Sequence, residues 1–424
     1  MADEIVEVVV IGGGAAGVAA ARRLTEAGVP TLLIEARDRL GGRARTILDS
    51  SGFALDLGCG WLHSADRNPW VEIALSQGCA IDRTPPPWSR SSPQPGFRAG
   101  EQSSFIQALM NYRARVDSIG EEEPDRAAAA AIEPDNRWRG LLNAISTFYS
   151  GAELDRVSAQ DLARYDDSGV NWRIPEGYGR VVAAYGQGLR VKFDCAVERI
   201  DRRGRRLRIE TTNGVVSADV AVVTLPSALI AERPELFLPT LPDKTEAAAG
   251  LPLGLADKLF LSLESPEQFE KDSRCFGRTD RTETGAYQMR PFGRPMVEAY
   301  FGGELAADLE KAGQAAFADF ALDELAGLFG SEFRRRVSPI AYHGWSADPL
   351  ARGSYSYALP GMADRRAMLG APVEERLFFA GEACSREGYS TAHGAYATGI
   401  QAADRIIAAL GVEKSPAAER TAQA

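Results

Sequence analysis

The sequence predicts an α/β protein with two domains, and three observations support this prediction. A chain of 424 residues exceeds one ordinary hydrophobic core, so two domains are expected. The N-terminus shows an apolar strand, a glycine-rich turn and an alanine-rich helix in succession, which is how a βαβ unit begins. Near the C-terminus, a second apolar strand is again followed by a helix.

The first strand and its turn are typical of a dinucleotide site. Val8 to Ile11 form a buried β-branched strand, and Ala15 to Ala27 form the helix. Gly12, Gly14 and Gly17 complete a GxGxxG turn. Such glycines permit a tight turn, close approach of backbone to a pyrophosphate and close packing of helix on strand. The free N–H groups and the dipole at the helix N-terminus favour a bound diphosphate.

A second strand, "TLLIE", ends in an acidic residue at the spacing that this motif requires. Glu35 lies about 20 residues beyond the glycines, where a carboxylate accepts a hydrogen bond from a ribose 2′-OH. Glycine turns are common before helices, but strand, turn, helix, strand and acid in this order indicate a dinucleotide-binding unit. We expect Ala15 and Ala16 at the helix start, and Ala36 beside the acid, to contribute backbone contacts to the cofactor.

The continuation "EARDRLGGRART" distinguishes FAD from NAD as the expected dinucleotide. It resembles the FAD-dependent amine oxidase superfamily, which includes monoamine oxidases, polyamine oxidases and lysine-specific histone demethylases. The Arg-x-x-x-Gly-Gly-Arg element of that family is matched by Arg37, Gly41, Gly42 and Arg43. The resemblance implies FAD, a Rossmann-type FAD domain and an α+β substrate domain. Arg43 can offer two parallel donors to a phosphate, whereas Arg39 is interpreted as a solvated charge.

The next motif, "ALDLGCGWLHSADRNPW", follows a short strand ending in Asp-x-Gly. In the amine oxidases this element places backbone against the flavin ring, and the matching residues are Gly58, Gly60 and Trp61. His63 lies two residues beyond, where polyamine oxidases often carry a histidine that faces the substrate. The resemblance therefore favours a substrate role for His63, although a lone histidine is more often structural.

The middle of the chain has weaker motifs. Residues 82–103 are rich in proline and serine and are expected to form a surface loop. From Ser104 to about Tyr165 the pattern is helical and is interpreted as the lid of the substrate domain. Turns at Arg203–Gly204 and Asn213–Gly214 separate alternating strands. In this region Val197 matches the family's valine, whose backbone contacts the adenine.

Lys258 is the residue that the resemblance assigns most directly to catalysis. It follows Asp257 at the start of an expected alternating strand, and many amine oxidases place a lysine there, near flavin N5 through a water. A lysine at a strand start is ordinarily solvated. In this position, however, a cation could order that water for flavin reoxidation or for hydrolysis of an imine. A helix from about Ala315 to Phe329 follows in the substrate domain.

The segment "GWSADPLARGSYSYALPG" resembles the demethylase and polyamine oxidase branches. Trp345 matches a tryptophan packed on the flavin, and Tyr355 matches one wall of an aromatic cage that holds an amine. Monoamine oxidases attach FAD to a cysteine where this chain has Ser354, so we expect noncovalent FAD. The second cage wall falls on Thr391, which favours a bulkier or longer substrate over small arylalkylamines.

The C-terminal motif is "LFFAGEACSREGYSTAHGAYATG". An apolar strand over Leu377–Gly381 delivers Glu382 to its carboxyl end, where open α/β sheets bind ligands. The resemblance assigns Gly381 and Glu382 to the diphosphate–ribityl region of FAD. The helix that follows begins near Thr391 and Ala392, and their backbone N–H groups are expected to face the pyrimidine oxygens of the flavin.

The same segment contains residues that a nucleophilic hydrolase would need. Cys384, Ser385 and His393 lie within ten residues of one another. No GxSxG elbow surrounds the serine, and members of a triad come from distant segments in known enzymes. We therefore interpret the cysteine and the serine as structural, and we expect the histidine to cap or pack its helix.

Composition excludes several other classes of protein. The formal net charge is −10 without a basic run, so nucleic acid is not expected as a partner. The five cysteines include no CxxC pair, which argues against a metal site and a disulfide framework. No signal peptide and no apolar run of roughly 20 residues is visible, so we expect a cytoplasmic protein without membrane contact, as a monomer or homodimer.

The resemblance covers nearly the whole chain and implies a discontinuous FAD-binding domain. We assign residues 1–75, 181–234 and 341–424 to it, and residues 76–180 and 235–340 to the substrate-binding domain with its helical lid.

The expected reaction is oxidation of an amine to an imine, and then to an aldehyde or ketone. Hydride would pass to flavin N5, and O2 would be reduced to H2O2. The alternatives are an FAD-dependent dehydrogenase or desaturase acting on a natural-product C–N or C–C bond, an amino-acid oxidase, a chromatin demethylase and a noncatalytic FAD-binding protein. Amino-acid oxidases carry an Arg-x-Pro element after Asp-x-Gly, and only Arg67 offers a substitute here. No coiled-coil insertion interrupts the substrate domain, so a demethylase is disfavoured.

Overall fold

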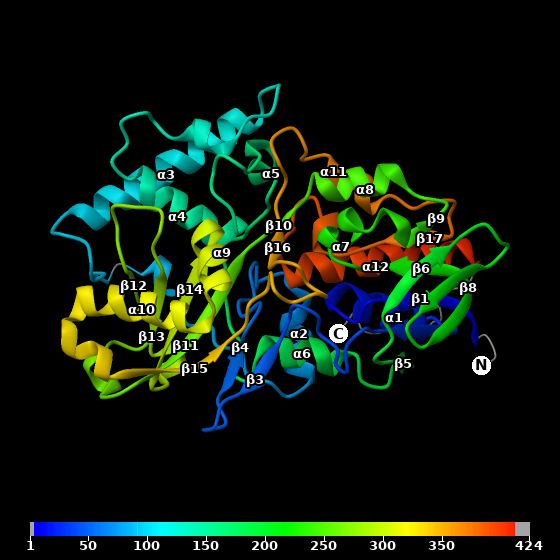
Figure 1. Cartoon of the computed structure of the whole chain (residues 1–424), viewed down its shortest axis with the longest axis horizontal. Helices are drawn as coiled ribbons and strands as arrows, with labels where there is room; N and C mark the ends of the chain where they lie inside the picture. The colour runs from blue at the N-terminus through cyan, green and yellow to red at the C-terminus, as the bar shows by residue number, and fades with distance from the viewer. Residues whose placement is uncertain (1–3, 91, 412–424) are drawn as a thin grey trace.

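Two large β-sheets lie toward opposite ends of an elongated molecule (Figure 1). The computed structural model describes residues 4–90 and 92–411. The strands of the first sheet are β1 (Glu4–Ile11), β2 (Thr31–Ile34), β5 (Val191–Lys192), β6 (Val197–Asp201), β7 (Leu207–Thr211), β8 (Gly214–Val223), β9 (Phe237–Leu238) and β17 (Leu377–Phe379). Their order is β5-β2-β1-β8-β7-β6-β9, and β17 also pairs with β8. Strands β5, β2, β1, β8 and β17 are parallel, as the βαβ pattern predicts.

Helices cover both faces of the first sheet. One face carries α1 (Ala15–Glu26), α6 (Tyr178–Tyr185) and α12 (Ala392–Ala409), and the other carries α7 (Ser227–Glu232), α8 (Pro242–Ala249) and α11 (Arg365–Gly370). Val10 packs toward the first set, whereas Val9 and Ile11 pack toward the second. Strands covered on both faces are apolar at successive positions, as in "EVVVI". This packing fixes the carboxyl ends of the strands, beyond which the glycine turn, Glu35 and Glu382 follow.

The second sheet is antiparallel and has two different faces. Its strands are β11 (Ala256–Leu263), β12 (Ser273–Phe276), β13 (Ala286–Met289), β14 (Met296–Gly302) and β15 (Val337–Tyr342), in the order β12-β13-β14-β11-β15. One face packs on α9 (Gly303–Ala312) and α10 (Gln314–Phe329), with Leu259 and Val297 in the shared cluster. Residues two apart on a strand share a face, so Lys258, Glu298 and Tyr300 lie on the other face.

A helical layer covers that polar face (Figure 1, upper left). It consists of α3 (Glu101–Gly120), α4 (Arg139–Ser150) and α5 (Ala159–Ala163). Phe105, Trp138 and Leu141 of this region share an apolar cluster with Phe276 of β12 and with Tyr357. The remaining elements are α2 (Pro69–Ser76), the hairpin of β3 (Thr46–Leu48) with β4 (Ala54–Asp56), and the pair of β10 (Leu253–Gly254) with β16 (Tyr355–Ser356).

Most elements that the sequence predicts are present with small shifts at their ends. The first helix ends at Glu26, the helical stretch from residue 104 to 165 contains most of α3 and all of α4 and α5, and the later helix is α10. The turn at Asn213–Gly214 joins β7 to β8. None of the helices within residues 4–90 and 92–411 combines the length and the apolar character needed to span a bilayer.

The strand that contains Lys258 differs from its predicted pattern. An alternating strand was expected there, but β11 is buried at seven of its eight positions. Both of its faces are covered, since Leu259 packs toward α10 while Phe260 packs against Leu55 and Met296. Lys258 is therefore a buried lysine within a strand rather than a residue at a solvated strand start.

The division into two domains is reflected in separate apolar clusters, whereas the assigned boundaries stay a prediction. Ile174 and Tyr178, which precede the proposed boundary at residue 180, pack in the cluster of α1 and α12. Trp345, which follows the proposed boundary at residue 340, packs in the cluster of α10. The outer ends of the assigned FAD domain, residues 1–3 and 412–424, lie outside the described residues.

Candidate active site

The turn after β1 leaves the N-terminus of α1 open to an anion. Gly14 is the N-cap, no side chain of the described residues caps this helix, and its first turn contains no acidic residue. A Cβ on Gly14 would meet no atom within 4 Å, whereas one on Gly17 would lie 1.8 Å from the carbonyl oxygen of Gly12. The helix thus packs directly on the turn and presents free N–H groups beside an open space, which fits a diphosphate.

The Arg-x-x-x-Gly-Gly-Arg element lies beside this turn. The Gly41 N–H donates to the Gly13 carbonyl over 2.8 Å, and a Cβ on Gly42 would lie 3.2 Å from the Cα of Gly14. The interpretation of Arg39 as a solvated charge was wrong. Its half-buried guanidinium donates to the Gly42 carbonyl, and burial lowers its pKa to about 10, with a further contribution from neighbouring arginines.

Glu35 is buried immediately after β2 and is held by backbone N–H groups. Its Oε2 accepts from the Gly13 N–H over 2.6 Å, and its Oε1 accepts from the Arg37 N–H over 2.8 Å. Ala36 lies between Glu35 and Arg37 in the chain. The carboxylate is therefore fixed at the end of the strand, while the guanidinium of Arg37 forms an ion pair with Asp348 over 2.8 Å.

Arg43 and Glu382, which the sequence assigns to the same part of the cofactor, form an ion pair of 2.9 Å. Glu382 is buried and also accepts from the Ser356 hydroxyl over 2.6 Å and from the Ser390 N–H over 3.0 Å. Burial alone would raise the pKa of Glu382, but Arg43 and these hydrogen bonds outweigh it and lower the pKa. The carboxylate is thus ionised and fully engaged. The carbonyl of the neighbouring Gly381 accepts from the Thr398 hydroxyl over 3.1 Å.

This ion pair predicts a pH dependence of stability. Because the folded pKa of Glu382 is lowered, its stabilisation is complete above its ordinary value of about 4.5 and is lost as pH falls through the lowered value. A Glu382→Gln variant should be less stable by about 1.5 to 3 kcal/mol at neutral pH. The difference should shrink below about pH 4.5, as measured by urea unfolding at a series of pH values. A difference that is constant down to pH 3 would contradict the ion pair.

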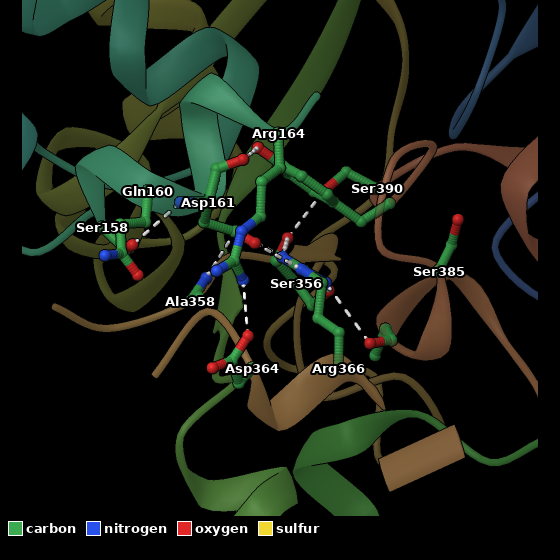
Figure 2. A network of polar contacts seen from close by, with 12 residues as sticks. Ser158, Gln160, Asp161, Arg164, Ser356, Ala358, Asp364, Arg366, Ser385 and Ser390 are labelled. Atoms are coloured by element: carbon green, nitrogen blue, oxygen red, sulfur yellow. Dashed lines mark hydrogen bonds and ion pairs between the residues drawn. The ribbon is translucent and has the colours of Figure 1, made fainter. Parts of the chain in front are cut away.

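Behind Glu382 lies a buried polar network that sequence reasoning did not find (Figure 2). Arg366 donates to both carboxylate oxygens of Asp161 over 2.7 Å, and each side chain is 1% exposed. Arg366 also donates to the Ser356 hydroxyl over 2.9 Å and stacks on the ring of Tyr389 at 3.8 Å. Asp161 lies on α5 of the helical layer and the others lie in C-terminal segments, so the network joins the two regions.

The Gly58–Gly60 segment meets Trp345, as the resemblance implies. A Cβ on Gly58 would lie 1.8 Å from the Arg43 carbonyl oxygen and 3.1 Å from the Trp345 ring. The indole N–H of Trp345 donates to the Leu57 carbonyl over 3.1 Å. Trp345 is 2% exposed, so its ring is held by contacts on several sides.

The loop that carries Trp345 is anchored by two carboxyl groups, one of them buried. Asp257, which is fully buried, accepts from the Trp345 N–H over 3.2 Å, and Glu310 accepts from the Ser346 N–H over 2.9 Å. Burial raises the pKa of Asp257 well above its usual value, and the adjacent Glu310 raises it further. The environment of Asp257 therefore favours its protonated form.

Lys258 lies directly beside the Gly58–Gly60 segment. Its Nζ donates to the Asp56 carbonyl over 3.0 Å and forms an ion pair of 2.9 Å with Glu298, and a Cβ on Gly60 would lie 3.1 Å from it. Burial opposes the charged amine, but the charges of Glu298 and Asp56 outweigh it and raise the pKa of Lys258. Lys258 is therefore a cation at neutral pH.

Tyr355 completes this face together with a residue that sequence reasoning missed. The Tyr355 hydroxyl donates to the Phe148 carbonyl over 2.6 Å and lies 3.0 Å from the Tyr300 hydroxyl. Tyr300 faces Lys258 across the β11–β14 pair. Glu298 and Tyr300 stand two apart in the otherwise apolar strand "MVEAYFG", and this spacing of polar residues on one strand face could have identified both.

The comparisons with known proteins agree with this geometry. The family model described as flavin containing amine oxidoreductase matches residues 15–99 and 105–407. The chain belongs to the flavin-containing amine oxidoreductases. The matched ranges begin at the helix that follows the glycine turn and include Lys258, Trp345, Tyr355 and Glu382.

Curated relatives of this amine oxidoreductase extend over nearly its whole length. Polyamine oxidase 2 of Arabidopsis thaliana is 29% identical over 434 residues, covering 94% of this chain and 87% of that protein. Polyamine oxidase 3 of Oryza sativa subsp. japonica is 29% identical over 433 residues, covering 93% and 88%. Lysine-specific histone demethylase 1 homolog 2 of the same rice is 28% identical and covers 94% of this chain but 57% of that protein.

Solved structures support the fold. Two variants of putrescine oxidase with redesigned cofactor binding align with TM-scores of 0.74 and 0.75, at 18% and 19% identity. The alignments cover 96% of this chain and 100% of each putrescine oxidase chain. This similarity confirms the two-domain fold of an FAD-dependent amine oxidase.

FAD is the cofactor that the family implies, and the described residues suit it. The open N-terminus of α1 and the guanidinium of Arg43 suit a diphosphate, and the N–H groups at the start of α12 suit an electron-rich ring. Val197, the predicted adenine contact, begins β6 and accepts from Arg233 over 3.3 Å through its carbonyl. Trp61 packs its ring against Trp88 with a centroid distance of 4.5 Å.

Thr391 and His63, one of the three histidines of this amine oxidoreductase, have structural partners. Thr391 is the N-cap of α12 and accepts from the Gly394 N–H over 3.0 Å, so of the two roles expected for His393, capping or packing, the cap belongs to Thr391. Burial lowers the pKa of His393 to about 4, with a further contribution from His63. His63 lies 2.6 Å from the Asn171 side-chain oxygen, and burial lowers its pKa as well, although this contact opposes the shift. Both imidazoles are therefore neutral at pH 7.

The hydrolase alternative has no support in the geometry. Burial raises the pKa of Cys384 to about 12, so the thiolate that a nucleophile needs is not formed at neutral pH. The Ser385 hydroxyl accepts from the Gly388 N–H over 3.1 Å, which is a local turn contact. Within the described ranges, no three His, Cys, Asp or Glu side chains gather in a way that could hold a metal ion.

Proposed function

We propose that this amine oxidoreductase is an oxidase that converts an aliphatic amine to an imine and releases H2O2. When bound, FAD supplies the electron-accepting chemistry, because its N5 takes hydride from the carbon next to nitrogen and O2 then reoxidises it. The observation that carries the proposal is the convergence of Lys258 and Trp345 beside the Gly58–Gly60 segment, with the Tyr355 hydroxyl 3.0 Å from that of Tyr300, which faces Lys258.

Each of these side chains has a role that its contacts support. Tyr355 offers an aromatic face that can attract and orient an amine, and Trp345 would pack against the flavin. Lys258 is charged and buried, so it can hold a water molecule in a fixed orientation for imine hydrolysis or for reoxidation. Arg43 and Glu382 form a rigid contact for the diphosphate and ribityl portions. The N–H groups of Thr391 and Ala392 would stabilise negative charge on the ring.

We further propose that FAD is bound noncovalently and that the substrate is long rather than compact. At the position where monoamine oxidases have the attaching cysteine, the buried Ser354 donates to the Ala256 carbonyl and accepts from the Ala256 N–H, both over 2.8 Å. Its hydroxyl is thus occupied by backbone. Thr391, at the second cage wall, is used as a helix cap and leaves room for a longer substrate.

Anaerobic mixing of the FAD-loaded enzyme with a panel of amines tests the function. Polyamines, diamines, arylalkylamines and amino acids are compared by the loss of yellow flavin absorbance. We expect aliphatic amines to bleach the flavin, faster toward alkaline pH because the neutral amine reacts. Readmission of O2 should then yield one H2O2 for each amine consumed.

Two results would contradict the proposal. If no amine bleaches the flavin, the chain is not an amine oxidase. If amines bleach it but O2 does not restore the colour, whereas an artificial electron acceptor does, the enzyme is a dehydrogenase or desaturase. Acid precipitation of the protein should leave the yellow colour in the supernatant, whereas a coloured pellet would contradict noncovalent binding.

A further inference from the structure

Arg274 is a half-buried arginine without an acidic partner. Within residues 4–90 and 92–411 its guanidinium donates no hydrogen bond and forms no ion pair. It stacks on the rings of Phe276, at 4.5 Å from the centroid, and Trp88, at 6.0 Å. The side chain is half-buried, and burial lowers the pKa of Arg274. The N–H groups of its guanidinium are accessible rather than buried without a partner, so they are available to an acceptor that enters from outside the chain.

Arg173, a buried arginine with a structural role, provides a comparison for Arg274. Its guanidinium forms ion pairs with Asp82 and Asp272 over 2.8 and 2.9 Å, and it stacks on Trp61 at 4.8 Å. Two carboxylates thus compensate its charge. Arg274 forms no such ion pair within residues 4–90 and 92–411, so its charge is available to an anion from outside the chain.

The sheet register places Arg274 on the face that carries Lys258. On β12, Arg274 pairs with Gln288 of β13, which pairs with Glu298 of β14. Directly paired residues share a face, and Glu298 binds Lys258 on that face. Adjacent strands are about 4.8 Å apart, so the backbone at Arg274 lies about 10 Å from Glu298, two strands away, and about 14 Å from the strand of Lys258.

A second set of contacts connects the Gly58–Gly60 segment to Arg274. The Trp61 ring lies 4.5 Å from the Trp88 ring, and Trp88 lies beside Arg274. Both aromatic rings are partly exposed, with Trp88 at 37%. A row of aromatic surface therefore connects the proposed reaction centre to the unpaired guanidinium.

We propose that Arg274 binds an anionic group at the far end of the substrate, so that the preferred substrate is a long aliphatic amine with a terminal carboxylate, at least about 10 Å in length. This inference rests on the proposed oxidase function of the same site. Planar guanidinium groups bind carboxylates through two parallel N–H donors, and a site with low water content strengthens that bond. Eight carbon atoms in an extended chain span about 10 Å.

The arrangement disfavours a substrate that is cationic at both ends. An ammonium group placed at Arg274 would meet a like charge in a site where burial strengthens the repulsion. The carboxylate of Glu298, which could attract a second ammonium, is already bound to Lys258 over 2.9 Å. The preferred substrate would thus differ from the polyamines and the putrescine that appear in the names of the similar proteins.

Three amines of equal length test the inference on the FAD-loaded enzyme: ω-aminooctanoate, its primary amide and diaminooctane. Anaerobic stopped-flow mixing gives the apparent Kd and the maximal rate of flavin bleaching for each. We expect ω-aminooctanoate to bind about 10- to 100-fold more tightly than the amide, with similar maximal rates. In Arg274→Met this preference should disappear while the amide is unaffected, and Arg274→Lys should keep part of it.

A matched control and an independent readout make each outcome informative. Arg336 also stacks on two rings, Phe269 and Phe333, so Arg336→Met should keep the preference. Octanoate, which has no amine, is titrated calorimetrically into wild type and Arg274→Met. If amines bleach the flavin but the amide or the diamine binds as tightly as the amino acid, Arg274 has no such role and the oxidase function stands.

The titration separates the remaining cases. If no amine bleaches the flavin but octanoate binds wild type and not Arg274→Met, the anion site stands and the oxidase proposal fails. If octanoate binds both proteins equally, or neither, the inference is overturned whatever the amines do.

Discussion

An Arg366→Met variant should unfold with about 3 to 5 kcal/mol less free energy than the wild-type chain. Arg366 and Asp161 are each 1% exposed and share two hydrogen bonds of 2.7 Å, so removal of the cation leaves a buried carboxylate without its counter-charge. The Ser356 hydroxyl also loses a donor. Urea denaturation at neutral pH measures the effect as a lower midpoint with an unchanged slope.

Arg164 provides the control, because it forms an ion pair of 2.8 Å with Asp364, whose side chain is 77% exposed. Arg164→Met should change stability by less than about 1 kcal/mol, since water replaces the lost partner. The double variant Asp161→Asn with Arg366→Met should recover part of the loss, because no uncompensated charge remains. If Arg366→Met and Arg164→Met lower the free energy of unfolding equally, the buried pair contributes no more to stability than a surface pair.

A Lys258→Met variant should slow the step that follows amine oxidation by about 10² to 10³-fold, the range observed when a positioned electrostatic group is removed. Lys258 is charged because Glu298 and Asp56 raise its pKa in spite of burial. The loss should therefore be the same from neutral pH up to about pH 10, within the range in which the wild-type lysine keeps its proton. Stopped-flow spectroscopy separates bleaching of the flavin by amine from its recovery with O2.

Lys311→Met is the matched control, since Lys311 is exposed on α9 and pairs only with the nearby Asp308. FAD content and thermal stability must be measured for both variants, because methionine at 258 also leaves Glu298 without a partner. Unchanged rates of bleaching and recovery in Lys258→Met, with full FAD content, would remove Lys258 from the catalytic assignment.

The parts of the site that the sequence predicts are those encoded in short segments. The glycine turn, Glu35 and Arg43 follow one another within 32 residues, so their spacing constrains their geometry without knowledge of the remaining chain. Strands covered on both faces and helices with small residues are also local properties. For this reason the fold class agrees with the sequence-based expectation, and the first helix and the second strand end within one residue of their predicted bounds.

The residues that sequence reasoning missed act across long separations. Arg366 and Asp161 are 205 positions apart, and neither segment has a pattern that distinguishes a buried ion pair from a solvated charge. Arg39 illustrates the same limit, because only the fold shows that the Gly41–Gly42 turn bends back to accept its hydrogen bonds. Glu298 and Tyr300 differ from these residues, because their spacing of two in an apolar strand is visible in the sequence and could have identified both.

The network of Arg366 also has a consequence for how the molecule opens. Asp161 is on α5 of the helical layer, whereas Arg366 and Ser356 are in C-terminal segments (Figure 2). Movement of α5 away from these segments would break the buried ion pair and leave Arg366, which donates to the Ser356 hydroxyl, without its counter-charge. Because Ser356 also donates to Glu382, opening of the helical layer would weaken the support of this carboxylate, and a ligand that holds Glu382 in place should make that opening less favourable.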